Sequence, residues 1–378
     1  MALESFFQPV PFYGEFRFTG LTHSPMPTEP TAPKRVTISD VARYAGVSNA
    51  TVSAVLNNKG TVKDSTRRRV LEAIEKLNYR PSGAARRRLQ PTVHRTIGLV
   101  VKEVDNPYFA DIFLGAREVA NRHGYTVLIT SSESDFASEH RIVDLLADKD
   151  VDGLIINPLL EEQADLSHLF ELKRRHIPFV LIENVLGLQA NIVDVDNVAA
   201  SKEATRYLIE GGHERIIHFA GPRYSLHTEE RIEGFRRAFS ESNLIFRDDM
   251  IVYAGARLRN GYEKGLEYFQ QHRHNLPTAV TCYNDLVAIG LMRALHQLGI
   301  KVPDQVSIIG YDDIAIAEYL PIPLTTVRMP KIEMGAKAAE LLIRQIEGAN
   351  GRGGPDTIER IILPAQLIIR DSTRILTA

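Results

Sequence analysis

The sequence predicts an α/β fold: a small all-α head at the N-terminus, followed by a core of two lobes with doubly wound parallel sheets. Three observations support this prediction. Short amphipathic helical patterns fill the region between about residues 36 and 80. From Thr96 onward, apolar strand-like runs alternate with helical patterns, in two successive sets. The 378 residues, 44% of them hydrophobic, are sufficient for two or three domains with buried cores.

The head begins with two short helices separated by a tight turn, in the stretch "DVARYAGVSNATVSAVLN" (residues 40–57). Thr37, with Asp40 three positions later, forms a capping-box-like start for the first helix. Gly46 lies in the turn, and Ser48 is the expected cap of the second helix. The pair is therefore predicted to be either a helix-turn-helix or an ordinary hairpin of two helices.

A third helix is expected to have Asp64 or Ser65 as its cap and to end at Pro81. Apolar residues recur on one face of each helix at helical spacing. They are Val41, Ala42 and Ala45 in the first helix, Val52, Val55 and Leu56 in the second, and Val70, Leu71, Ile74 and Leu77 in the third. These faces predict a small helical bundle with a core of its own.

The two lobes are predicted from the alternating elements that follow. The first set has expected strands at 96–101, 125–130, 151–157 and 177–183, and expected helices at 110–124 and 140–150. The second set has expected strands at 215–221, 278–284 and 306–312, and expected helices at 231–239 and 286–299. Apolar runs without alternation are typical of parallel strands covered on both faces. Two such lobes are expected to hold a ligand between them, beyond the carboxyl ends of the strands.

Charge is distributed unevenly along the chain. The formal net charge is −2, but residues 34–95 hold 14 lysines and arginines against four acidic residues, which leaves about −12 for the rest. A basic head on an acidic body is typical of proteins whose head binds a polyanion. The alternative is a solvated basic helix face. Together with the Arg-rich segment at 82–91, the charge favours a DNA-binding helix-turn-helix over an ordinary hairpin.

Several other classes of protein are disfavoured. Cys282 is the single cysteine, so an internal disulfide framework is excluded. No apolar run approaches the roughly 18 residues of a membrane span, and the first 35 residues carry no secretion signal. These features predict a cytoplasmic protein. We find no nucleophile elbow, P-loop or metal-ligand cluster, so neither an enzyme nor a cofactor or metal site is expected.

The expected domain organisation has four parts. Residues 1–34 are rich in Pro, Thr, Ser and Gly and are expected to be a disordered extension, in which Met26 is an alternative start. The head is expected to span 35–80 and a hinge 81–95. The core is expected to span 96–378, with the chain crossing between its lobes near residues 195 and 325.

The motifs of this chain resemble a known family. "VTISDVARYAGVSNATVSAVLN" and "LNYRPSGAARR" are similar to the lactose/galactose-repressor family of bacterial transcription regulators. The similarity continues through "NPYF", "VDVDN", "GGHERI", "RIEGF", "TAVTCYND", "VSIIGYDD", "PLTTV" and "LIIRDST", and it covers about residues 36–374. The resemblance implies a DNA-binding head, a hinge helix and a dimeric core like the two-lobed periplasmic sugar-binding proteins.

The resemblance also implies DNA-contacting residues. The recognition helix would run from about Asn49 to Asn57, with bases read from Asn49, Ala50 and Ala54. Asn49 offers a hydrogen bond to a base, whereas Ala50 offers a methyl contact, for example to thymine. Ala54 departs from the larger residue that is common at its position. The remaining head contacts implied by the resemblance, mainly to phosphates, are Thr37, Ser48, Thr51, Ser53 and Asn57.

The hinge departs from the family pattern. The family places a leucine seven residues after the hinge proline, where two copies wedge into the minor groove. Here that position is Arg88, and Leu89 follows it. Either a local insertion restores Leu89 as the wedge, which we favour, or the wedge is absent and the segment from Arg86 to Arg88 binds electrostatically.

The resemblance places a small-molecule effector, expected to be a sugar, between the lobes. Asn106 would bond a sugar hydroxyl while Tyr108 and Phe109 flank the ring; alternatively the two aromatic residues simply pack the lobe interface. The other implied effector-binding positions are Glu183, Asn184, His227, Arg231, Asn284, Asp285 and Asp312, with Ser225 on the same loop as His227. Polar side chains that converge from separate strand ends suit a polyhydroxylated ligand.

These expectations combine into a functional prediction. The chain is expected to be a dimeric, sequence-specific DNA-binding regulator, and more specifically a repressor, whose operator affinity is controlled by a population shift on ligand binding. The alternative is a solute-binding protein, which would share the core but has no use for residues 36–90.

Overall fold

The computed structural model describes residues 36–56, 62–77, 79, 94–148, 151–160, 165–223, 225–348 and 358–376. The chain divides into two compact units, Met1–Ser82 and Gly83–Ala378. We call them the head and the core and describe each by itself. None of the helices within the described ranges has the length and apolar character needed to span a bilayer.

Within its described residues, the head contains three helices around a small apolar core. They are α1 (Ile38–Ala45), α2 (Asn49–Leu56) and α3 (Asp64–Lys76). The buried side chains are Val41, Ala42, Ala45, Val52, Val55, Val70 and Ala73. Gly46 ends α1 with φ at 65°, a left-handed conformation that glycine adopts without steric cost, and this turn sets α2 against α1.

The predicted start of α1 is confirmed. The Asp40 carboxylate accepts hydrogen bonds from the Thr37 backbone N–H at 2.9 Å and from the Thr37 hydroxyl at 2.7 Å. Ser48 accepts from the Thr51 backbone N–H at 3.1 Å, as a cap of α2 does. The prediction for α3 was wrong in three details. The helix already includes Asp64 as its first residue, and it ends at Lys76 and not at Pro81. Leu71 is 52% exposed, because Ala73 occupies the inward face instead.

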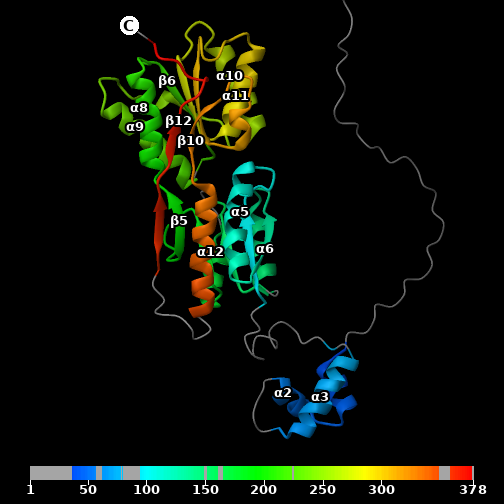
Figure 1. Ribbon diagram of the computed structural model, residues 1–378. Helices are drawn as coiled ribbons and strands as arrows, with labels where there is room; N and C mark the ends of the chain where they lie inside the picture. The colour runs from blue at the N-terminus through cyan, green and yellow to red at the C-terminus, as the bar shows by residue number, and fades with distance from the viewer. Residues whose placement is uncertain are drawn as a thin grey trace, which may run out of the picture. The chain divides into compact units, whose positions relative to one another are not determined.

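The first lobe of the core is a six-stranded, wholly parallel sheet with the order β11-β5-β4-β3-β1-β2. Its strands are β1 (Thr96–Val101), β2 (Thr126–Ser131), β3 (Gly153–Ile156), β4 (Phe179–Ile182), β5 (Asn191–Val195) and β11 (Arg360–Leu363). Its helices are α5 (Pro107–Arg122), α6 (Phe136–Asp148), α7 (Ser167–Arg174) and α12 (Lys331–Glu347). Helices α5 and α12 pack on one face of the sheet, and α6 and α7 cover the other (Figure 1).

The second lobe is a six-stranded sheet with the order β12-β10-β9-β8-β6-β7, in which only β12 runs antiparallel. Its strands are β6 (Ile216–Ala220), β7 (Ile251–Tyr253), β8 (Ala279–Cys282), β9 (Ser307–Asp312), β10 (Thr325–Arg328) and β12 (Gln366–Ile368). Its helices are α8 (Asn197–Glu210), α9 (Leu226–Ser240), α10 (Leu258–Gln271) and α11 (Asp285–Gln297), with short 3-10 turns at Asp248–Met250 and Ala315–Glu318. Helices α8 and α9 pair on one face and α10 and α11 on the other (Figure 1).

The chain passes between the lobes three times: from β5 into α8, from β10 into α12, and from β11 into β12. In both lobes the sequence alternates a strand with a covering helix, so the carboxyl ends of the parallel strands share one edge of each sheet. Side chains from these two edges hydrogen-bond to one another across the boundary, as with His227 of α9 and Asp194 of β5. We call this region the interlobe junction.

Two glycines bring α5 and α12 into close contact. A Cβ at Gly335 would lie 1.9 Å from the Ile112 carbonyl oxygen, and a Cβ at Gly115 would lie 1.9 Å from the Ile332 carbonyl oxygen. No other residue fits at these positions without separating the helices. The α5–α12 pair therefore forms a tightly packed layer on one face of the first lobe.

Candidate functional site

The first candidate site is the outward face of α2 in the head. Asn49 and Ala50 are exposed at its start, and Ala54 lies one turn after Ala50. The Asn49 amide nitrogen donates to the Ser39 hydroxyl at 3.1 Å, which holds this side chain at the N-terminal end of the helix. A face of short side chains brings the helix backbone close to whatever it docks against.

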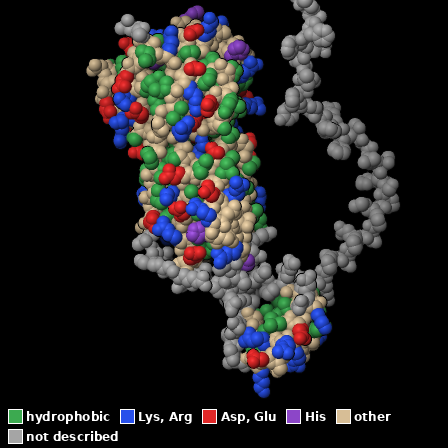
Figure 2. All heavy atoms as spheres, viewed as in Figure 1, with side chains coloured by type: hydrophobic (Ala, Val, Ile, Leu, Met, Phe, Trp, Pro, Cys, Tyr) green, Lys and Arg blue, Asp and Glu red, His purple; other side chains and the backbone are tan. Residues whose placement is uncertain are grey.

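A hollow lies beside this face. Its lining combines apolar and basic side chains from α2 and from the start of α3: Val47, Ala50, Thr51, Ala54, Val62, Lys63, Thr66 and Arg69. The apolar floor suits a methyl group, and the basic rim suits phosphate oxygens. Figure 2 shows Lys and Arg side chains on the visible surface of the head. Asn57, Arg86, Arg88 and Leu89, which were predicted as DNA contacts, lie outside the described residues.

The second candidate site is the interlobe junction, which contains a chain of buried charges. On the first-lobe side, the Lys102 ammonium lies 2.5 Å from the Glu183 carboxylate. These residues follow β1 and β4, and Glu183 has an unusual φ of 105°. Burial alone would favour the neutral forms, but attraction outweighs it: Glu183 raises the pKa of Lys102, and His227 together with Lys102 lowers the pKa of Glu183.

His227 of α9 extends this chain into the second lobe. Its Nε2 lies 2.9 Å from Asp194 Oδ1, and its Nδ1 lies 3.8 Å from Glu183 Oε2. Burial opposes the imidazolium, but the two carboxylates outweigh this effect and raise the pKa of His227. Ser225 also donates to Glu183, at 3.3 Å. The second lobe therefore holds the first through an imidazole that lies between two carboxylates.

Arg231 lies one helical turn after His227 and is 4% exposed. Its guanidinium carbon lies 3.7 Å from the Tyr311 ring centroid and 4.6 Å from the Tyr283 ring centroid. Its Nε donates to the Asn197 side chain at 3.2 Å, and a terminal nitrogen donates to the Tyr283 carbonyl oxygen. Stacking and hydrogen bonds together fix the guanidinium in one orientation.

Asp312 ends β9 with φ at 108°, a backbone strain of the kind that clusters at functional sites. It is 5% exposed, and the described residues supply no hydrogen-bond donor to its carboxylate. Burial raises the pKa of Asp312 to about 6, although Arg231 and Lys331 oppose this rise. Lys331 donates instead to the carbonyl oxygens of Asp312 and Asp313, at 2.6 and 2.7 Å.

The residues of the "NPYF" motif begin α5. Asn106 caps this helix by accepting from the Tyr108 backbone N–H at 3.1 Å, so α5 starts at Pro107 and not at residue 110 as predicted. Tyr108 and Phe109 are buried and meet edge to face, with centroids 5.1 Å apart. They belong to the same apolar cluster as Tyr311. Burial, together with the charge of Asp312, raises the pKa of Tyr108.

Asn284 and Asp285 have structural partners. Asn284 caps α11 by accepting from the Val287 N–H at 2.9 Å, and it donates to the Ala256 carbonyl oxygen at 2.8 Å. Asp285 is fully buried and accepts from the Thr326 hydroxyl at 2.6 Å and from the Ile314 N–H at 2.8 Å. Its carboxylate ties α11 to β10 and to the loop that follows β9, so Asp285 is occupied within its lobe.

The structure therefore brings four predicted residues together, Glu183, His227, Arg231 and Asp312, and it places Asn106 and Tyr108 at the adjoining start of α5. Asn184 is half-buried beside Glu183. Sequence reasoning missed Lys102, Asp194, Asn197, Tyr283 and Tyr311. The one available signal was position, because Lys102 directly follows a predicted strand and Tyr283 and Tyr311 each lie one residue before the end of another. Among the described residues, no group of three or more His, Cys, Asp or Glu side chains is arranged to hold a metal ion.

A basic helical head joined to a two-lobed α/β core with polar groups at the lobe boundary defines the class of ligand-responsive DNA-binding regulators. The family profile described as "Bacterial regulatory proteins, lacI family" matches residues 37–82, and that of the "Periplasmic binding protein-like domain" matches residues 205–373. The HTH-type transcriptional repressor PurR of Vibrio parahaemolyticus serotype O3:K6 (strain RIMD 2210633) is 38% identical over 321 residues, which cover 82% of this chain and 92% of that protein. The chain belongs to the lacI family of bacterial transcriptional regulators.

Solved structures support the same assignment. The transcriptional regulator CelR in complex with cellobiose is 30% identical, with a TM-score of 0.67, and the match covers 89% of this chain and 100% of that one. The lac repressor dimer bound to operator and the anti-inducer ONPF is 25% identical, with a TM-score of 0.65 and coverage of 90% and 100%. The predicted fold, a helical head with a two-lobed core of parallel sheets, is thereby confirmed.

Proposed function

We propose that this protein is a repressor and that the binding of a small effector at the interlobe junction sets its affinity for operator DNA. The head binds the operator, and a small effector binds the core. The observation that carries the proposal is the conjunction, in one chain, of a lacI-type head with a buried, polar junction between two lobes. A solute-binding protein would need only the core.

The proposed operator contacts lie on the head and in the segment that follows it. Asn49, Ala50 and Ala54 read bases, and Lys63 and Arg69 at the rim of the adjoining hollow bind phosphates. The proposed boundaries are 35–80 for the head, 81–95 for the hinge and 96–378 for the core. Leu89, in the hinge, is the proposed minor-groove wedge. The other proposed DNA contacts are Thr37, Ser48, Thr51, Ser53, Asn57, Arg86 and Arg88.

The proposed effector is a sugar or a sugar derivative. Asp312 presents a carboxylate that accepts from hydroxyl groups, and Arg231 presents a fixed guanidinium that donates to hydroxyl oxygens. Asn106 and Tyr108 complete the proposed contact set from the first lobe, and Asn184, Asn284 and Phe109 adjoin it. The CelR structure, which contains cellobiose, supports a sugar as the ligand class.

The proposed coupling is a population shift between open and closed lobes. His227 bonds Asp194, and Arg257 bonds Glu103 at 3.0 Å, in each case across the lobe boundary. Such bonds exist only when the lobes are closed, so an effector that touches both lobes favours that state. In a dimer, closure of the lobes changes the distance between the hinges of the two protomers, and this change alters the operator affinity.

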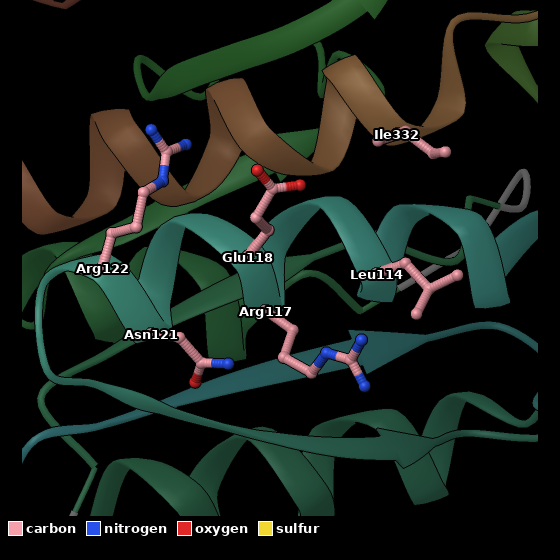
Figure 3. A pocket seen from close by; sticks show the side chains of 6 residues that line it. All are labelled: Leu114, Arg117, Glu118, Asn121, Arg122 and Ile332. Carbon is pink, nitrogen blue, oxygen red and sulfur yellow. The ribbon is translucent and has the colours of Figure 1, made fainter.

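The proposed assembly is a homodimer that pairs through the α5–α12 face. A groove on this face exposes Leu114 and Ile332 between charged side chains of both signs, Arg117, Glu118 and Arg122 (Figure 3). A patch that carries both charges around exposed apolar side chains can pair with a copy of itself, as an isologous interface requires. The lac repressor structure is a dimer. We further propose that the protein acts in the cytoplasm and has no catalytic role, in keeping with relatives that are DNA-binding repressors.

The test is operator binding by the full chain and by a fragment of residues 94–378. Selection from random duplexes is expected to return a near-palindromic site for the full chain, with affinity that falls by about 10³–10⁵ between 50 and 200 mM salt if six to ten phosphates are contacted. The fragment is expected to stay folded and to lose all operator binding. Retained operator binding by the fragment would overturn the proposal.

A further inference from the structure

A buried imidazole joins the two lobes of the core. His227 lies on α9 of the second lobe, and its side chain is 8% exposed. Its Nε2 lies 2.9 Å from Asp194 Oδ1, and its Nδ1 lies 3.8 Å from Glu183 Oε2, so it contacts two carboxylates of the first lobe. The Glu183 and Asp194 side chains are themselves buried. Solvent and salt therefore screen this contact much less than a contact on the surface.

The charges of this contact depend on the proton of the imidazole. Glu183 and Asp194 supply two negative charges, and Lys102, 2.5 Å from Glu183, supplies one positive charge. Within this group of four side chains, the charges balance only when His227 is an imidazolium. With a neutral imidazole, one buried carboxylate has no counter-charge in the group, and an uncompensated charge is costly where water is excluded.

Three further charged groups act on His227 through their charge. Glu230 and Arg231 lie on the same helix, and Asp312 ends β9 of the same lobe. Burial opposes a proton on His227, and so does Arg231, whereas Glu230 and Asp312 favour it. The two carboxylates of the first lobe outweigh the opposing effects, and the pKa of His227 is raised above 6.5.

We propose that the proton on His227 acts as a second ligand of the core, one that favours closure of the lobes, so that pH shifts the balance of open and closed states without any effector. Opening would return the imidazole to water and remove it from the two carboxylates. A site that binds a proton more tightly in the closed state closes when it is protonated, because linkage is reciprocal.

The size of the effect follows from the same linkage. Between pH 6.5, the ordinary value for an imidazole in water, and the raised pKa of the closed state, the equilibrium constant for closure should fall by up to about tenfold for each pH unit. The signal is distinct from the small effector. Its consequence for DNA rests on the proposed function, which links closure to operator affinity.

The test of closure uses the full chain with a single tryptophan as reporter, because the natural sequence has none. Val104 is 61% exposed and follows Glu103, which bonds Arg257 across the lobe boundary at 3.0 Å. The emission of Val104→Trp is recorded between pH 6 and 9.5 without effector. It is expected to move to longer wavelength as the pH rises, with a midpoint above pH 6.5, because opening exposes the indole to water.

Three variants in the reporter background separate a proton switch from a structural contact. His227→Gln keeps a polar side chain that does not titrate, and it is expected to abolish the shift in emission. Asp194→Asn removes one of the two carboxylates and is expected to move the midpoint to lower pH. His296→Gln, at an exposed position of α11, is the matched control and is expected to shift like the reporter protein. Circular dichroism and a cooperative melting transition establish that each variant is folded.

The outcomes separate the inference from the proposed function. An emission that is constant between pH 6 and 9.5, or that shifts equally in His227→Gln, would overturn the inference and leave the proposed function intact. The same holds for a midpoint that Asp194→Asn leaves unchanged. Operator titrations at pH 6 and pH 9 test the consequence, and the ratio of the two affinities is expected to be larger in the wild type than in His227→Gln. Equal ratios, together with an emission shift that depends on His227, would support the proton switch and overturn the proposed link between closure and operator affinity.

Discussion

Replacement of Asp312 by asparagine should stabilise the effector-free protein, even though it removes a binding residue. Burial raises the pKa of Asp312 from 3.8 to about 6. At about 1.4 kcal/mol for each pKa unit, this difference means that the ionised carboxylate costs the folded state about 3 kcal/mol relative to its neutral form. Asparagine resembles the neutral form in shape and charge, so Asp312→Asn should recover most of this free energy at pH 8.

The pH dependence gives this prediction its sign. A carboxyl whose folded-state pKa is raised binds protons more tightly when folded, so the wild type should lose stability as the pH rises from about 4 to about 6. The advantage of Asp312→Asn should therefore be near zero at pH 4 and reach its full size above pH 6. Denaturant unfolding of the core transition at pH 4.5, 6 and 8 measures it, with Asp249→Asn as the exposed control. A variant that is less stable than the wild type at pH 8, or equally altered at all three pH values, would refute the reasoning.

Three further predictions follow from the junction, from the helix packing and from the hinge. The wild-type core should lose stability as the pH rises above 6.5, because a histidine with a raised pKa stabilises the fold fully below pH 6.5 and loses this effect as the pH rises through its folded-state pKa. His227→Gln should remove this loss. Melting temperatures of both proteins between pH 6 and 9 test the prediction, and melting temperatures that change with pH in parallel for variant and wild type would contradict it. Gly335→Ala should lower the free energy of unfolding by about 1–3 kcal/mol or more, because its Cβ would meet the backbone of α5. The control Glu333→Ala, on the exposed side of α12, should change the free energy of unfolding by no more than about 0.5 kcal/mol in the same assay. Leu89→Ala should weaken specific operator binding far more than non-specific binding, whereas Arg88→Ala should weaken both and flatten the salt dependence; equal operator affinity for wild type and Leu89→Ala in a binding titration would refute the wedge.

The architecture was predictable because its signals are local. A strand such as Thr96–Val101 is an unbroken apolar run, and that pattern requires cover on both faces. Helix ends were less predictable. The start of α5 was placed three residues late, because the apolar pattern of the helix begins after the turn that Asn106 caps and Pro107 opens. Leu71 was assigned to the core because it lies at helical spacing, but a bundle of three short helices buries a narrower stripe than the pattern covers.

The pairing at the junction was not predictable from the sequence. Lys102 and Glu183 are separated by 81 residues, and they meet only because β1 and β4 end at the same sheet edge. The contact of His227 with Asp194 also depends on how far the two lobes close. Asp285 had the residue type and the position of a ligand contact. Its carboxylate instead accepts a hydrogen bond from Thr326, which lies on a strand 41 residues further along the chain. Such choices depend on tertiary geometry, which periodicity does not encode.

The most direct test of the central claim is the affinity of the full chain for its selected operator, measured by fluorescence anisotropy while candidate sugars are titrated and the one that raises the melting temperature of the protein is taken as the effector. Coupled sites in regulators differ in affinity by about 5- to 150-fold between the two states. The wild type is predicted to change its operator affinity by a factor in this range, and Asp312→Asn is predicted to bind the operator with an affinity that the effector does not alter. An operator affinity of the wild type that is unchanged at saturating effector would contradict the account.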